Sequence, residues 1–172
     1  LGCPLEPSKV QRVQISCPGQ LLPKIPPELL TSPHSQLIHH VDFSRNDITD
    51  IAVLNNLVNL TTLLLNQNRL GNAAIAALRL NSLYTLWIHD NKISSLTELM
   101  DSLITNLPSL AFLSLHTNPC CQNYTGTPES KSLPDYRTYV QYALRRTLKY
   151  LAPPPSDQRP APPPLPDTAV HF

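Results

Sequence analysis

The chain has 172 residues, of which 41% are hydrophobic and 15% charged, and 13 Lys and Arg against 12 Asp and Glu give a formal net charge of +1. This balance argues against nucleic-acid binding driven by bulk positive charge. The sequence contains no run of about 18 apolar residues, the length needed to span a bilayer. The composition therefore predicts a soluble globular domain with a sizeable core. The 19 prolines gather near the two ends and are almost absent between Ser35 and Leu107, which predicts a regular middle section.

Residues 1–35 are expected to form an N-terminal cap that contains a degenerate copy of the repeat described next. Val10, Val13 and Ile15 occupy apolar slots of that repeat, and Pro18 stands where the later copies have asparagine. The chain begins at Leu1, and the residues that follow include no apolar segment of signal-peptide length.

A pattern of the form L-x-x-L-x-L-x-x-N-x-L recurs between residues 36 and 121. Its copies begin at Ile38, Leu60, Leu83 and Leu110, and their asparagines, at positions 46, 68, 91 and 118, lie 22, 23 and 27 residues apart. This pattern and spacing are typical of leucine-rich repeats. One copy cannot bury its own apolar face, so the copies are expected to stack. The sequence therefore predicts an α/β fold: a solenoid with short parallel strands on its concave face and 3₁₀ or helical turns on its convex side.

The return segments differ in length and in apolar spacing. After Asn46 an apolar residue recurs every third position, which favours 3₁₀ turns, at Ile48, Ile51, Leu54, Leu57 and Leu60. In the longer third segment Ser95 and Glu98 form a capping-box pattern. A helical stripe of apolar residues follows, at Leu96, Leu99, Met100, Leu103 and Leu107.

Residues 122–152 are expected to cap the last repeat with a helix. Asp135 stands at its start, and Arg145, Arg146 and Lys149 lie toward its end, where the helix dipole favours positive charge. Apolar and aromatic residues recur at helical spacing along it, at Tyr136, Tyr139, Val140, Ala143, Leu144 and Leu148. Residues 153–172 are rich in proline and are expected to form a disordered or polyproline II tail.

The segments LYTLWIHDNKISSLTELMDSL, LPSLAFLSLHTNPCCQN and DYRTYVQYALRRTLKYL carry a closer resemblance. Together they resemble the leucine-rich melanocyte differentiation-associated protein family, and the similarity covers about residues 38–151. This resemblance implies a non-enzymatic intracellular adaptor linked to melanosome or endosome-related trafficking, with a Rab-type small GTPase or a trafficking complex as its partner.

In a solenoid the strand residues between the apolar template positions face the concave surface, and these are the candidate partner-binding residues. They are His40, Asp42, Leu64, Asn66, Thr85, Trp87, His89, Phe112, Ser114 and His116. Leu64, Trp87 and Phe112 are expected to form an apolar patch of the composition found at binding hot spots. The alternative is that Trp87 only packs beneath a neighbouring loop or the N-terminal segment.

His89 and His116 occupy matching slots of successive repeats and are expected to approach each other. A structural or solvated pair is preferred to a metal site because no carboxylate or cysteine shares their column. The sequence has no G-x-S-x-G motif and no phosphate-binding glycine loop, so neither an enzyme nor a cofactor is predicted.

The four cysteines, at positions 3, 17, 120 and 121, lack zinc-binding spacing, and adjacent cysteines rarely bond to each other. They favour a reducing intracellular compartment and hence a cytoplasmic location, on melanosome or endosome surfaces through partners if the resemblance holds.

Two further segments are candidates for binding: a basic group in the cap and a proline-rich motif in the tail. Arg137, Arg145, Arg146 and Lys149 could contact an acidic partner, a phosphoinositide or RNA, although a solvated helix side is the simpler account. In the tail, a polyproline ligand for SH3 or WW domains is formed by Pro163, Pro164, Leu165 and Pro166.

Two other function classes stay open beside the adaptor. Sequons at Asn59 and Asn123 would suit a secreted or cell-surface recognition domain, against which stands the lack of a cysteine-rich cap. An RNA-associated scaffold is disfavoured by the near-neutral charge.

Overall fold

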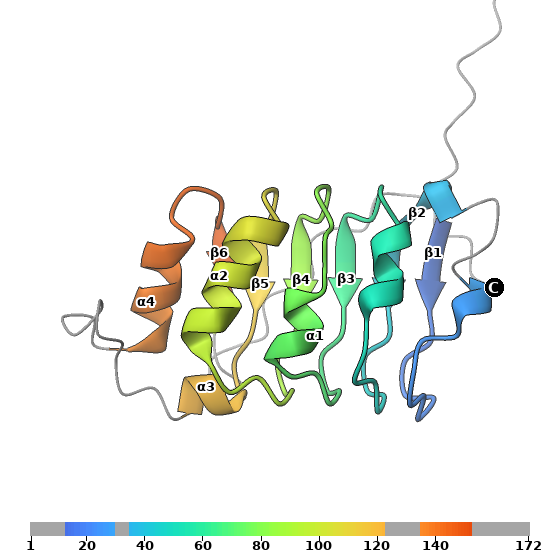
Figure 1. Cartoon of the computed structure of the whole chain (residues 1–172), viewed down its shortest axis with the longest axis horizontal. Helices are drawn as coiled ribbons and strands as arrows, with labels where there is room; N and C mark the ends of the chain where they lie inside the picture. The colour runs from blue at the N-terminus through green and yellow to red at the C-terminus, as the bar shows by residue number, and fades with distance from the viewer. Residues whose placement is uncertain (1–12, 30–34, 123–134, 153–172) are drawn as a thin grey trace, which may run out of the picture.

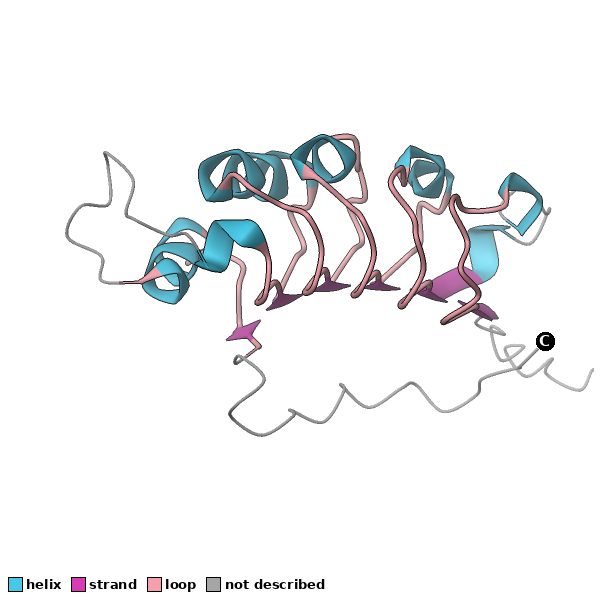
Figure 2. Cartoon of the chain, turned by 90° about the horizontal axis from the view of Figure 1, so that it is seen from below, coloured by secondary structure: helices cyan, strands magenta, loops and turns pink. Residues whose placement is uncertain are grey.

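Six parallel strands form one sheet in chain order in this computed structural model, which describes residues 13–29, 35–122 and 135–152 (Figure 1). The strands are β1 (Val13–Ser16), β2 (Ile38–Asp42), β3 (Thr62–Leu64), β4 (Thr85–Trp87), β5 (Phe112–Ser114) and β6 (Tyr150–Leu151). The short 3₁₀ helices are η1 (Pro27–Leu29), η2 (Ser35–Leu37) and η3 (Ala52–Asn56), and the α-helices are α1 (Asn72–Ala76), α2 (Leu96–Asn106), α3 (Pro119–Gln122) and α4 (Tyr136–Ala143). Figure 2 shows the strands along the inner side of the arc and helices along its outer side, so the predicted solenoid is confirmed.

The core lies between the sheet and the helical layer. Template positions of successive strands, such as Val41, Leu63 and Leu86, are completely buried. These residues are also register partners, so each apolar side chain stacks on its counterpart in the next repeat. Because neighbouring residues of a strand point to opposite faces, the residues between them lie on the concave side.

The recurring asparagines hold successive turns together. Asn68 donates its side-chain amide to the carbonyls of Leu65 in its own turn and Phe43 in the preceding one, at 3.0 and 2.9 Å. Its Oδ1 accepts the N–H of Ile48, at 3.0 Å. Asn46, Asn91 and Asn118 form equivalent bonds within their own turns and to the preceding turns. The asparagine of each tight turn therefore also links that turn to the preceding repeat.

The residue before each of these asparagines has a left-handed backbone. Arg45, Gln67, Asp90 and Thr117 have φ angles of 56 to 61°. This conformation is unfavourable for residues with a side chain by roughly 1–2 kcal/mol. The hydrogen bonds of the adjacent asparagine offset that cost.

The first repeat is present, but its predicted register is wrong by two residues. Ile15 pairs with Val41 and Ser16 with Asp42, which makes Gln20, and not Pro18, the counterpart of Asn46. Gly19 has the left-handed φ of 68° expected just before that position. A shift of two residues keeps the same side chains on the same face of a strand, so apolar alternation alone could not reveal it.

The helical expectations on the convex side are confirmed, with one difference at the capping box. The Oγ of Ser95 accepts the Glu98 N–H at 3.3 Å and caps α2 as predicted. The Ser95 N–H, however, donates to Oδ1 of Asn72 in the preceding repeat, at 3.0 Å. The second half of the box is therefore replaced by a contact between repeats.

The predicted cap helix is too long. Asp135 caps α4 by accepting the Thr138 N–H at 2.9 Å, but the helix ends at Ala143 and the chain turns back to form β6. Tyr150 then donates its N–H to the carbonyl of Ala111, at 3.0 Å. Pairing with the free edge of β5 satisfies backbone groups there, which a continued helix would leave exposed.

The structure also places two positive charges of the cap elsewhere than on the solvated side of a helix. Lys149 lies beside β6 and not on the helix, and the Arg137 guanidinium donates to the carbonyls of Ala152 and Leu151, at 2.6 and 3.0 Å. Arg137 is therefore a structural residue that fixes β6, and not part of a solvated helix side.

No helix in the described ranges has the length and apolarity needed to cross a membrane. Cys17, Cys120 and Cys121 carry free thiols, whereas Val10, Cys3, Asn123 and the polyproline residues 163–166 lie outside the described residues.

The concave face as a candidate binding site

Strand register arranges the candidate residues in two rows across the concave face. The first row follows the register partners His40, Thr62, Thr85, Phe112 and Tyr150. The second follows Asp42, Leu64, Trp87 and Ser114. Partners on adjacent strands lie about 4.8 Å apart, so side chains within a row are direct neighbours.

Leu64 and Trp87 are direct neighbours in the second row, and both are half-buried. On one side their row continues to Asp42, whose carboxylate accepts the Ser44 N–H at 2.9 Å. On the other side Trp87 lies next to Ser114 in register and its ring lies 6.1 Å from that of His89. The two apolar side chains are therefore flanked by polar groups, as in the centre of many protein interfaces.

Phe112 has two aromatic neighbours. It belongs to the first row, and its ring lies 5.2 Å from Tyr84 and 6.0 Å from Tyr150. Within the described part of the chain no ring contact joins Phe112 to Trp87. The apolar patch of Leu64, Trp87 and Phe112 therefore stays a prediction, and Phe112 also lies beside two tyrosines.

Sequence analysis missed Tyr84, Tyr150 and Lys149 as surface residues of this face. Tyr84 and Tyr150 are 39% and 37% exposed, and the Lys149 Nζ lies 3.2 Å from the Tyr84 hydroxyl. The open edge of the last predicted strand requires another strand or a cover and could have indicated Tyr150 and Lys149, but not Tyr84, which directly precedes β4.

Thr85 and Ser114 lie on the predicted face but are only 2% exposed, so neither presents a free surface to a partner. Ser114 instead supports the neighbouring repeat, because its hydroxyl lies 2.8 Å from Nδ1 of His89. His40, Asp42 and Asn66 are half-buried on this side of the sheet.

His89 and His116 are stacked, as their matching slots suggested, with ring centroids 4.4 Å apart and planes at 19°. Burial, reinforced by His116, lowers the pKa of His89 from 6.5 to about 4, with Asp90 opposing the shift. Burial also lowers the pKa of His116. Both rings are therefore neutral near pH 7.

The stacked pair does not extend to a metal site in the described ranges, which hold no group of three His, Cys, Asp or Glu side chains suited to one ion. What the face offers is a row of apolar side chains flanked by polar and charged groups, the means of a binding surface.

Three comparisons relate the chain to known proteins. The human Leucine-rich melanocyte differentiation-associated protein is 35% identical over 94 residues, which are 54% of this chain and 46% of that protein. The chain therefore spans about half the length of this curated relative.

Among solved structures, one from the Drosophila melanogaster SNF/U2A' complex has a TM-score of 0.56 and 25% identity, over 79% of this chain and 71% of that one. An internalin from Listeria monocytogenes has a TM-score of 0.47 and 19% identity, over 82% of this chain and 47% of that one.

The family comparison covers most of the chain. Residues 8–151 match the Leucine-rich repeat family, a span that includes β1 to β6 and the cap. The repeated asparagine bridges and the parallel sheet provide the structural reason for this match. The chain belongs to the leucine-rich repeat family.

Proposed function

We propose that this chain is a non-catalytic scaffold that binds a protein partner on the concave face of its sheet. The observation that carries the proposal is the pair Leu64 and Trp87, two large apolar side chains that stand side by side and half-buried between polar groups. Trp is the residue most enriched at energetically dominant positions of interfaces. The pair is therefore the proposed anchor, and His40, Asp42, Asn66 and His89 are proposed contacts around it.

The similarity to a structure solved as a complex of SNF with U2A' supports a role in protein assembly. The finer proposal is that the partner is a Rab-type small GTPase or a trafficking complex at melanosome or endosome surfaces. Its support is the name of the human relative and the sequence resemblance, which extends over about half of that protein.

The experiment compares proteins retained by the wild-type chain and by Trp87→Ala when both are expressed in the cytosol of pigment cells. Val58→Ala is the matched control, because Val58 is an exposed apolar residue outside the sheet. We expect Trp87→Ala to lose the partner and Val58→Ala to keep it. Loss of a small GTPase in particular would support the trafficking proposal.

The stability of both variants is measured in parallel by thermal unfolding. Because Trp87 is half-buried, its truncation is expected to cost less than the roughly 3–5 kcal/mol typical of a core aromatic residue. Unchanged partners would place the site elsewhere, and a loss of several kcal/mol would make Trp87 a packing residue.

A further inference from the structure

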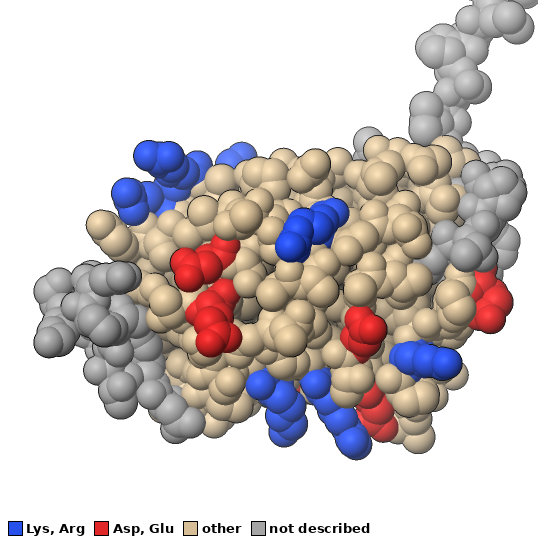
Figure 3. Space-filling model, in the orientation of Figure 1, with Lys and Arg blue, Asp and Glu red and all other residues tan. Residues whose placement is uncertain are grey.

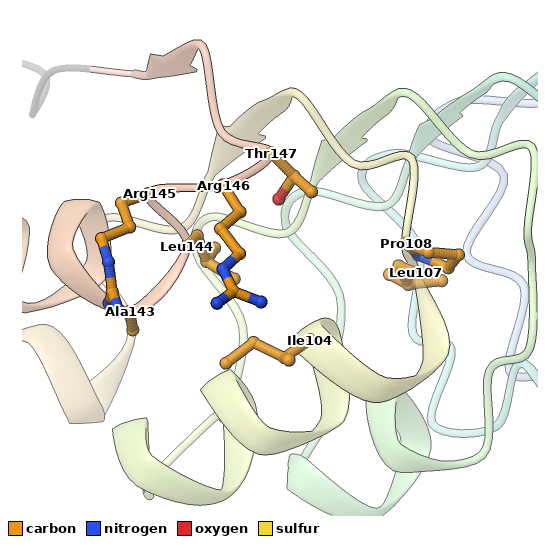
Figure 4. Close-up of a pocket in the computed structure, with 8 residues that line it drawn as sticks. All are labelled: Ile104, Leu107, Pro108, Ala143, Leu144, Arg145, Arg146 and Thr147. Atoms are coloured by element: carbon orange, nitrogen blue, oxygen red, sulfur yellow. The ribbon is translucent and has the colours of Figure 1, made fainter.

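A groove outside the concave face lies between α2 and the turn that follows α4. Its cavity volume is about 360 Å³, and it is lined by Ile104, Leu107 and Pro108 on one side and Leu144, Arg146 and Thr147 on the other (Figure 4). We call it the cap groove. Its size is near the lower end of ligand-binding cavities, which suits one or two side chains.

The lining of the cap groove is mainly apolar and partly open to solvent. Ile104 is 53% exposed although it follows the buried stripe of α2, and Figure 4 shows its side chain facing Arg146 across the groove. A large aliphatic side chain left exposed in the wall of a groove gains by burial against another apolar group.

Arg146 has no acidic partner within ion-pair distance among the described residues, and its side chain is exposed. The two neighbouring cations are engaged differently. Arg145 also lines the groove, but it lies over the Tyr142 ring at 4.6 Å and donates to the Tyr142 carbonyl; Lys149 lies 3.2 Å from the Tyr84 hydroxyl. Figure 3 shows Lys and Arg side chains gathered beside the cap, apart from the acidic side chains over α2.

We propose that the cap groove binds a short peptide segment of a partner in which an acidic residue stands next to a leucine-like residue. The apolar side chain contacts Ile104 and Leu107, and the carboxylate pairs with the Arg146 guanidinium. The planar guanidinium can donate two parallel hydrogen bonds to one carboxylate, which gives such a contact its direction.

Charge and lining favour a peptide over other anionic partners. Recognition of anionic membranes through basic clusters usually takes 4–8 Lys or Arg residues, more than the three described at this edge, Arg145, Arg146 and Lys149. Binding of single-stranded nucleic acid usually needs aromatic stacking surfaces, and the lining of the groove contains none.

Asp101 provides an internal check on the proposed charge pairing. It lies three residues before Ile104 on α2, one helical turn away, but not within ion-pair distance of Arg146. An acidic peptide would be repelled by Asp101 and attracted by Arg146. Asp101→Asn is therefore expected to strengthen peptide binding, while Arg146→Glu weakens it.

The experiment selects a random peptide library displayed on phage against the whole chain, and then measures the enriched peptides by fluorescence anisotropy. We expect a consensus with Asp or Glu beside Leu, Ile or Phe. Affinity should fall about tenfold or more in Arg146→Glu and in Ile104→Ser. Lys92→Glu is the matched control, because Lys92 is exposed, makes no ion pair in the described structure and lies outside the groove.

Trp87→Ala distinguishes binding in the cap groove from binding on the concave face. This substitution should leave the affinity of the enriched peptides unchanged. The proposal is overturned if no acidic and apolar consensus emerges, or if the enriched peptides depend on Trp87 and not on Arg146. Sedimentation with phosphatidylserine vesicles that depends on Arg146, without a peptide consensus, would also overturn it in favour of a membrane surface.

Discussion

The side chain of Asn68 joins two neighbouring turns through donors and acceptors that are otherwise hidden from water. Its amide nitrogen donates to the carbonyls of Phe43 and Leu65, and its oxygen accepts the Ile48 N–H. Truncation would leave the Ile48 N–H without this acceptor and would remove one bond from each carbonyl, to which Asn46 and Asn91 also donate; Asn68 is only 5% exposed. Each buried polar group without a partner costs about 1–3 kcal/mol.

Asn68→Ala is therefore expected to lower the free energy of unfolding by about 3 kcal/mol or more, measured by urea denaturation. Asn56→Ala is the control, because Asn56 is exposed on η3 and should change stability by less than about 0.5 kcal/mol. Equal effects of the two substitutions would contradict the bridging role of Asn68.

The low pKa of His89 predicts that the fold loses stability at acid pH. In the folded chain the pKa of His89 is about 4, against an ordinary value of 6.5, so the unfolded chain takes up this proton first as the pH falls. The contribution of His89 to stability is complete above about pH 6.5 and is lost as the pH falls toward about 4.

His89→Gln removes the titrating group and keeps a side chain that can bond to Ser114. We expect this variant to lose less stability than the wild-type chain when thermal unfolding is measured at about pH 7.5 and again at about pH 4.5. An identical acid loss in both proteins would show that His89 is not protonated preferentially on unfolding.

At the scale of elements, periodicity predicted those parts that repeat and are long enough to show their pattern. Strands β2 to β5 and helix α2 follow from apolar spacing and from Ser95 as a capping residue, and the structure confirms them. The two-residue strand β6 shows no periodicity of its own, and its formation depends on the open edge of β5. The register of β1 was missed because Gln20 replaces the usual asparagine.

The candidate site was predictable to the same extent. The alternation of a strand identified the residues of the concave face, including the neighbours Leu64 and Trp87. It could not show that Thr85 and Ser114 are buried, because exposure depends on the whole surroundings of a side chain. Tyr150 joined the site only through β6, which tertiary pairing creates.

Arg137 is expected to be the residue that holds β6 in place. Arg137→Met removes the donors to the carbonyls of Leu151 and Ala152 while keeping an unbranched side chain. We expect a loss of about 2–3 kcal/mol and faster hydrogen exchange of the Tyr150 and Ala152 amides, which bond to β5 and its preceding loop. Arg146→Met is the matched control, and equal exchange in both variants would contradict this role.

At the scale of the molecule, the residues that stabilise the fold are separate from those proposed to bind a partner. The asparagine bridges and the apolar core hold the repeats together from within, whereas Leu64 and Trp87 lie on the opposite face of the sheet from the core. The solenoid can therefore present apolar side chains to a partner without taking them from its core. We propose that a partner docks on this face.

The most direct test places a photo-crosslinking amino acid at position 64 on the concave face, and in a second protein at position 58 outside the sheet. After irradiation in cells, we predict a discrete protein adduct from position 64 that disappears when Trp87→Ala is added, and no such adduct from position 58. An adduct from position 58 alone, or one from position 64 that persists without the Trp87 side chain, would contradict the account.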